Sequence, residues 1–90
     1  MGRRKRLTEF NVSLSEKVLI NLHNLCATRS EWAKRSDELA QVLQVDVNEV
    51  NRILEGHVSE GYVSSFTDNE GNKRYHLTST GIIRVCSLFS

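Results

Sequence analysis

Cysteine and long apolar segments are both scarce in this chain, and each scarcity excludes a class of protein. The 90 residues include only two cysteines, which lie far apart and lack the paired spacing of a disulfide framework. No apolar run is long enough to cross a bilayer, and the basic start is not followed by the apolar region of a signal peptide. We therefore expect a single soluble, cytoplasmic domain that makes no use of a membrane.

Motifs for catalysis and for metal binding are missing as well. The sequence has no nucleophile elbow, no phosphate-cradling glycine loop and no evident pair of carboxylates. Its three histidines and two cysteines do not have zinc spacing, and His23 and Cys26 project from different sides of the helix predicted around them. The sequence thus predicts a protein that is not an enzyme and holds no metal or cofactor. No residue argues for a small-molecule ligand.

The charge is distributed unevenly along the chain. The formal net charge is +1, but a basic run stands at the start, and residues 7–90 hold eight basic against eleven acidic side chains. The run consists of Arg3, Arg4, Lys5 and Arg6. Residues 1–12 are predicted to form a flexible basic arm, because its first part, MGRRKR, is highly charged and has no apolar residue after Met1. Such an arm can contact DNA phosphates or the minor groove, or it can be only a solubilising tail.

The stretch of residues 36–63 predicts two short helices joined by about three residues. Leu39, Ala40 and Leu43 share one side of the first helix, with Ser36 as its N-cap. Asp46 caps the second helix in an acidic variant of the capping box with Glu49. The second helix has an apolar stripe of Val47, Val50, Ile53, Leu54 and Val58. This arrangement is typical of a helix-turn-helix.

The segments before the helix-turn-helix predict one more helix and a connector. Residues 14–26 place six apolar residues on one stripe, with Ser13 or Ser15 as the cap, while Ile20 falls on the opposite side. Residues 27–35 form a connector around Trp32, the only tryptophan. An aromatic residue at this position either packs beneath the helix-turn-helix or is exposed for stacking on bases, and we expect Trp32 to be packed.

After Gly61 the pattern changes from helical to alternating. Residues 62–67 and 73–78 read as strands, and the turn residues DNEGN between them predict a hairpin. Together with the helix-turn-helix and the closing segment LTSTG, this pattern resembles the winged-helix DNA-binding domains of small prokaryotic MarR-like or ArsR-like transcription regulators. The resemblance implies an α+β fold, a winged helix-turn-helix with a three-helix core, a β-hairpin wing and a short C-terminal helix, with the winged-helix domain at residues 13–81.

The resemblance also implies double-stranded DNA as the partner and indicates which residues contact it. The second helix would enter the major groove, where Arg can bond to guanine and Asn to adenine, and the wing would contact the backbone. The predicted DNA-binding residues are Arg3, Arg4, Lys5, Arg6, Lys34, Arg35, Val47, Asn48, Glu49, Asn51, Arg52, Lys73 and Arg74. The acids Asp68 and Glu70 weaken the wing as a DNA element. A winged helix can also serve as a protein-interaction module of a larger assembly, and the mildly acidic body keeps that alternative open.

Two positions in the second helix depart from the family pattern. His57 stands in the apolar stripe, where a buried histidine satisfied by its neighbours is the expectation and a pH-sensing group the alternative. Gly56 costs about 1 kcal/mol relative to alanine inside a helix, so close approach of another backbone or of DNA is the predicted reason for it.

The last segment, residues 82–90, is more apolar than one core contact can bury if it is helical. We expect it to form a homodimer contact, with capping of the chain's own core as the alternative. The predicted dimer residues are Ile20, Ile82, Ile83, Val85, Cys86, Leu88 and Phe89.

Overall fold

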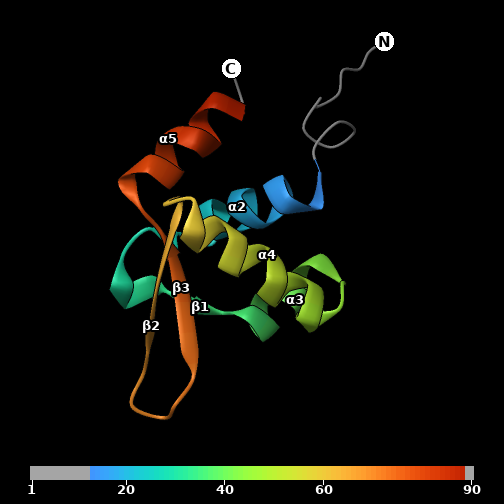
Figure 1. Cartoon of the computed structure of the whole chain (residues 1–90), viewed down its shortest axis with the longest axis vertical. Helices are drawn as coiled ribbons and strands as arrows, with labels where there is room; N and C mark the ends of the chain where they lie inside the picture. Colours follow the sequence, from blue (N-terminus) through green and yellow to red (C-terminus); the bar gives the residue numbers. More distant parts are fainter. Residues whose placement is uncertain (1–12, 89–90) are drawn as a thin grey trace.

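The computed structural model describes residues 13–88 as four α-helices and a three-stranded antiparallel sheet (Figure 1). The predicted arm residues Arg3–Arg6 and the predicted dimer residue Phe89 lie outside the described residues. The elements in chain order are α2 (Leu14–Asn24), the 3₁₀ turn η1 (Ser30–Trp32), β1 (Lys34–Arg35), α3 (Ser36–Leu43), α4 (Val47–Ser59), β2 (Val63–Thr67), β3 (Lys73–Leu77) and α5 (Ser79–Leu88).

The four described helices and the sheet enclose one apolar core. Helix α4 crosses in front of α2 in Figure 1, and α3 lies beside the first half of α4. Each helix contributes the stripe that its periodicity predicts, and the sheet closes the core from below. The fully buried large side chains are Leu19, Leu22, Leu39, Leu54, Leu77, Val18, Val50 and Val85.

The helix starts agree with the predicted caps at two of three positions. Ser13 caps α2 in a full capping box with Glu16, and the Asp46 side chain accepts a hydrogen bond from the Asn48 amide at 2.8 Å. The prediction of Ser36 as a cap is wrong by one residue. Helix α3 begins at Ser36 itself, because the amide of Arg35 donates to the Glu38 carboxylate at 2.8 Å and makes Arg35 the N-cap.

The predicted hairpin is confirmed and is joined by a third strand. Strands β2 and β3 pair with Ser65 opposite Tyr75, and β1 pairs with the other edge of β3, which gives the order β1-β3-β2. Asp68 organises the turn by accepting from the amides of Glu70 and Asn72 at 2.9 Å each. Val63, Tyr75 and Leu77 are buried, so one face of the hairpin meets the core.

Trp32 is a correction to the sequence analysis. Its side chain is 56% exposed at the end of η1, whereas the neighbouring Ala33 is buried and occupies the predicted packing position. The 3₁₀ turn shifts the phase of the chain by one residue just before β1, so that alanine faces the core and tryptophan faces solvent.

Helix α5 serves the monomer core as well as the surface. Val85 is completely buried, so its assignment to a dimer surface is corrected, and Ile82 is partly buried against the same core. Ile20, predicted to lie away from the core, also packs partly against it. Of the predicted dimer residues on α5, Ile83, at 69%, and Cys86 are exposed. Helix α5 therefore does leave apolar surface exposed, as predicted, but fewer of its apolar residues are exposed than the sequence indicates.

Candidate nucleic-acid interface

The outer face of α4 carries the predicted base-reading residues. Asn48 and Arg52 are exposed, Asn51 is partly exposed, and Val47 is 36% exposed although it belongs to the apolar stripe. The buried stripe of α4 fixes the helix against α2 and α3, so these side chains are presented by a rigid element. Helix α4 can therefore offer amide and guanidinium groups to a groove of DNA.

Arg52 is held by an acid on its own helix. Its Nη2 donates to Glu49 Oε2 one turn earlier, and both side chains are largely exposed. Exposed pairs of this kind contribute only about 0.3–0.5 kcal/mol, so a base edge or phosphate can displace Glu49. The acid that was predicted to complete the capping box serves this pair instead.

The wing is tied to α4 through Glu55, which the sequence analysis did not single out. Its Oε2 accepts from Lys73 Nζ at 2.8 Å and from Tyr75 Oη at 2.7 Å. These two hydrogen bonds, that of Lys73 first, lower the pKa of the Glu55 carboxyl. Burial, followed by the bond to Glu55, raises the pKa of Tyr75. The predicted DNA contact Lys73 therefore also connects β3 to the middle of α4.

The second predicted wing cation is also engaged. Arg74 Nε donates to Asp68 Oδ2 at 2.6 Å, and its Nη1 donates to the Ala33 carbonyl at 3.4 Å. The bond from Arg74 and the backbone amide of Asn72 lower the pKa of Asp68. Arg74, on β3, thus links the turn of the wing at Asp68 to Ala33, the residue just before β1. Asp68 neutralises this cation within the wing, and a DNA contact by Arg74 stays a prediction.

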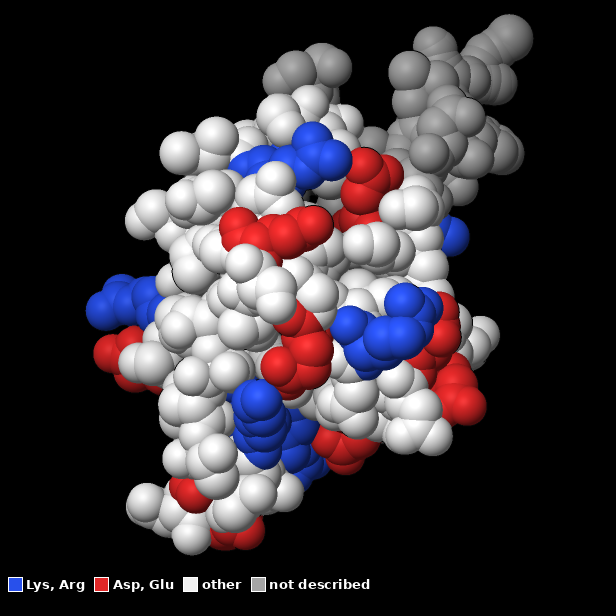
Figure 2. All heavy atoms as spheres, viewed as in Figure 1, with Lys and Arg blue, Asp and Glu red and all other residues white. Residues whose placement is uncertain are grey.

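The remaining predicted cations lie in β1. Arg35 Nε is 3.1 Å from Asp37 Oδ1, while Lys34 forms no ion pair with another residue in the range 13–88. Six of the eight Lys and Arg side chains within that range make such a pair, with Lys17 and Lys34 the exceptions. Figure 2 shows the result on the face that carries α4, where basic and acidic patches alternate and no continuous basic strip runs across the face. Most fixed positive charge in this range is locally neutralised.

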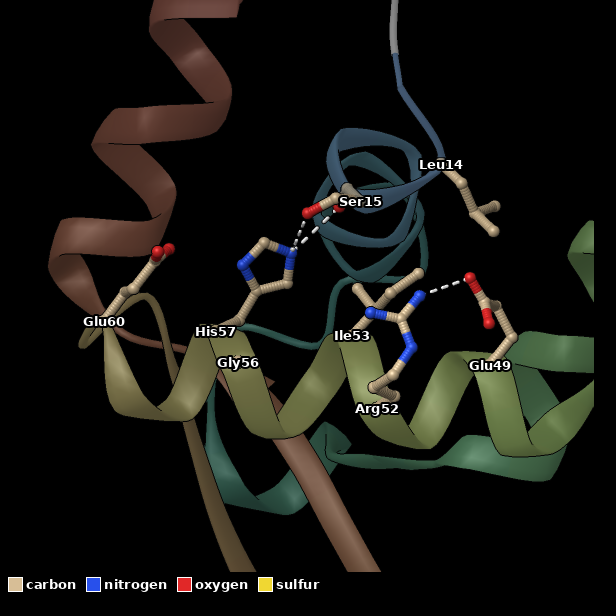
Figure 3. Close-up of a pocket in the computed structure, with 8 residues that line it drawn as sticks. All are labelled: Leu14, Ser15, Glu49, Arg52, Ile53, Gly56, His57 and Glu60. Atoms are coloured by element: carbon tan, nitrogen blue, oxygen red, sulfur yellow. Dashed lines mark hydrogen bonds and ion pairs between the residues drawn. The ribbon is translucent and has the colours of Figure 1, made fainter.

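A hollow of about 290 Å³ lies between the start of α2 and the outer half of α4. It is lined by Leu14, Ser15, Glu49, Arg52, Ile53, Gly56, His57 and Glu60, and is called the α2–α4 groove below (Figure 3). His57 is 5% exposed, and its Nε2 lies 2.9 Å from the Ser15 carbonyl oxygen and 3.2 Å from the Ser15 hydroxyl. The expectation of a buried, satisfied histidine is met at this ring nitrogen.

Neither a metal site nor a membrane helix is found within the part of the chain that the structure describes. No three His, Cys, Asp or Glu side chains there are placed to hold one metal ion. No helix there is both long and apolar enough to cross a bilayer.

Comparisons by sequence find no matching family model and no curated relative. Solved structures, in contrast, match almost the whole chain. A mutant of MarR from Escherichia coli, crystallised with operator DNA, has a TM-score of 0.70 and 25% identity over 90% of this chain. MepR, a transcription regulator of the multidrug efflux pump MepA of Staphylococcus aureus, has a TM-score of 0.70 and 21% identity over 92%.

A third structure matches over its full length. A putative DNA-binding protein from Ralstonia eutropha has a TM-score of 0.73 and 17% identity, with 89% of this chain and 100% of that chain aligned. The MarR and MepR matches involve only 56% and 62% of those chains, so this chain spans little more than half the length of either regulator. The domain is a MarR-like winged helix-turn-helix, as the sequence analysis expected.

Proposed function

We propose that this chain is a transcription regulator that binds double-stranded DNA with α4 in the major groove. Asn48, Asn51 and Arg52 read base edges, and Lys73 and Arg74 of the wing contact the backbone or minor groove once DNA displaces their acids. The arm residues 3–6 supply much of the phosphate contact, because residues 13–88 hold eight basic against ten acidic side chains.

One observation carries this proposal. The arrangement of α3, α4 and the wing is similar to that of a MarR structure solved with operator DNA, at 25% identity over 90% of this chain. The exposed Asn and Arg side chains on the outer face of α4 supply the chemistry that major-groove reading requires. The pairing of Arg52 with Glu49 does not oppose the role, since an exposed pair is easily exchanged.

The proposal includes a homodimer, which would present two copies of α4 to adjacent half-sites. Ile83 and Cys86 on α5 supply the exposed part of the contact, and Ile20 and Leu88 lie partly exposed on α2 and α5. Sedimentation equilibrium of the chain and of Ile83→Asp tests it. A shift of the variant towards monomer is expected, while Val42→Asp, which changes another exposed apolar residue on α3, should leave the mass unchanged.

DNA binding itself is tested by its salt dependence on a mixed-sequence duplex. The intact chain should lose affinity steeply with salt, with a log–log slope of about 0.9 per phosphate contact. A full-length variant with Arg3, Arg4, Lys5 and Arg6 replaced by Gln should have a slope shallower by up to about 3.6. Replacing Lys17 and Arg29 by Gln provides a control for charge lost at positions that are not predicted to contact DNA. Absence of binding by the intact chain at low salt would contradict the proposal.

Base reading is tested separately with Arg52→Ala. Bidentate bonding of an Arg to guanine discriminates by about 1–3 kcal/mol, so the variant should lose roughly 5- to 150-fold in preference for its selected site. Its affinity for unrelated duplexes should change much less, because those contacts are made to phosphates. Equal loss on every sequence would remove the base-reading role.

The second candidate is a protein-interaction module within a larger assembly. The local neutralisation of six cations and the mixed charge of the α4 face favour it. If this second candidate is right, a protein partner binds the outer face of α4, and its affinity depends little on salt. Duplex DNA does not displace the partner, because the chain then has no affinity for DNA.

A further inference from the structure

We propose that the chain's own basic arm, Arg3–Arg6, docks in the α2–α4 groove when nucleic acid is absent. The groove lies where the described chain begins, since Leu14 and Ser15 form one of its walls. Its other wall is α4, the helix proposed to read DNA. Docking would therefore place the arm against α4 and shield the groove side of that helix from solvent.

The groove is rich in hydrogen-bond acceptors, which selects a cationic donor. Glu49 and Glu60 contribute carboxylates, and Arg52, the basic side chain of the lining, is paired with Glu49. Glu60 makes no ion pair with another residue in the range 13–88. It is also the C-cap of α4, where the helix dipole is negative and favours a cation. A guanidinium or ammonium group is the complementary ligand.

His57 gives the groove a second, independent reason to take a donor. The ring is nine-tenths buried, and a carbonyl oxygen can only accept, so the Nε2 facing Ser15 carries the hydrogen. In the neutral ring Nδ1 is then an acceptor, and it makes no hydrogen bond with any residue the structure describes. Figure 3 shows the imidazole between Ser15 and the Glu60 side chain, with Nδ1 on the side away from Ser15. A guanidinium can donate to Nδ1 and to Glu60 together.

The floor of the groove is open, and the arm is long enough to reach it. A Cβ built on Gly56 would meet nothing within 4 Å, so the described chain leaves this glycine uncovered. Arg6 precedes Leu14 by eight residues, which span up to about 28 Å when extended, whereas the eleven residues from Glu49 to Glu60 rise only about 16 Å along the helix. The basic run can turn back and reach any point of the groove.

Docking makes the arm a competitor of DNA for the same helix face. Without DNA, the four basic side chains neutralise Glu49 and Glu60 beside Arg52. DNA phosphates release them, so the arm changes from covering the reading face to contacting the backbone. DNA must displace the docked arm before it can bind, which lowers its apparent affinity. A duplex that makes many phosphate contacts can overcome this loss, whereas a ligand that makes few cannot.

The experiment uses the full-length chain labelled with ¹⁵N, at low salt and without DNA, so its result does not depend on DNA binding. It compares the chain with a variant in which Arg3, Arg4, Lys5 and Arg6 are all Gln, and it follows the ring nitrogens of His57 and the backbone amides of Gly56 and Glu60. All these resonances are expected to differ between the two proteins. Adding salt to about 1 M, where screening acts within about 3 Å, should move the wild-type resonances to those of the variant.

Three controls separate docking from simpler effects. In the Glu60→Gln background, replacing the four basic arm residues by Gln should shift the resonances less than it does in the parent chain. Dilution should leave the original shift differences unchanged, because the contact is within one chain. The double variant Lys17→Gln, Arg29→Gln removes charge at residues that do not line the groove and should not move the His57 or Gly56 resonances. The proposal is overturned if the arm substitutions leave these resonances in place, if the control moves them equally, or if the shifts fade on dilution, which would assign the groove to the arm of a second copy.

Discussion

Gly56 and Gly81 are both helical glycines, yet the same substitution by alanine should change stability in opposite directions. Gly56 lies on the exposed face of α4, and an added Cβ would have nothing within 4 Å. Gly81 is buried in the first turn of α5, and an added Cβ would overlap the carbonyl oxygen of Tyr62. The surroundings, not the propensity scale, decide the sign.

For Gly56 the propensity term stands alone. Alanine is favoured over glycine by about 0.8–1.0 kcal/mol inside a helix, because glycine loses more backbone entropy on folding. With no steric term to subtract, Gly56→Ala should raise the free energy of unfolding by up to about 1 kcal/mol. In a domain of this size that corresponds to a melting temperature about 4–8 °C higher.

For Gly81 the steric term dominates. The Tyr62 carbonyl accepts from the Thr78 amide at 3.0 Å, so it cannot move away without losing that hydrogen bond. The built Cβ also lies 3.0 Å from Leu77 Cδ2, which is packed in the core. Overpacking of this kind costs about 1–3 kcal/mol or more, which exceeds the helix gain. Gly81→Ala should therefore lower the melting temperature.

Thermal unfolding followed by circular dichroism at 222 nm measures both variants against the parent chain, with urea denaturation as an independent check of the free energies. The two variants should differ by the steric cost at Gly81, about 1–3 kcal/mol or more. Both variants are measured at about 1 M salt, where the proposed contact of the arm with the α2–α4 groove is screened. A destabilised Gly56→Ala under these conditions would refute the reasoning, since it would mean that another part of the folded domain occupies the space over this glycine. A neutral Gly81→Ala would refute the close approach of α5 to Tyr62.

Two further predictions concern the core and the link between wing and helix. Leu54→Ala, at a completely buried position, should cost about 2–5 kcal/mol, whereas the exposed Val42→Ala should stay within about 0.5 kcal/mol by the same urea assay. Tyr75→Phe removes a hydrogen bond to the half-exposed Glu55 carboxylate and should cost about 1–1.5 kcal/mol, with Glu55→Gln closing a double-mutant cycle. Because the folded pKa of Glu55 lies below its ordinary value of 4.5, its stabilisation is complete above that value and is lost as the pH falls through the folded pKa. Glu55→Gln should therefore flatten the acid limb of the stability curve, and an unchanged acid limb would remove the proposed role of this carboxylate.

Local patterns were sufficient to predict most of the fold. The stripe of α4, the cap at Asp46 and the turn residues of the wing all act within a few residues of one another, and the structure has each of them. Tertiary packing then follows, because a helix with one apolar face and a hairpin with one apolar face must bury both against each other. Trp32 shows the limit of this approach, since a one-residue phase shift in η1 exchanged it with Ala33.

Contacts between distant residues could not be predicted in the same way. Glu55 is 18 residues from Lys73 and 20 from Tyr75, and His57 is 42 residues from Ser15. No periodicity or spacing in the sequence connects these pairs, because their proximity is set by the crossing of α4 with α2 and with the sheet. The buried position of Val85 is of the same kind, since only the fold decides which side of α5 the core uses.

The pairing of the wing cations changes how the charge of this domain should be understood. A simple charge count would treat Lys73 and Arg74 as free to bind DNA. Lys73, however, is paired with Glu55 on α4, and Arg74 is paired with Asp68 in the turn of the wing. A phosphate that binds Lys73 or Arg74 must replace the carboxylate already paired with that cation. The contact therefore contributes less binding free energy than a contact with an unpaired, solvated lysine would. The arm carries four basic residues and a single acid, Glu9, in its twelve positions. In the proposed complex with DNA, the folded domain sets the geometry of the interface and the arm supplies most of the electrostatic attraction. Substitutions in the arm should therefore alter the salt dependence of binding more than substitutions in the wing.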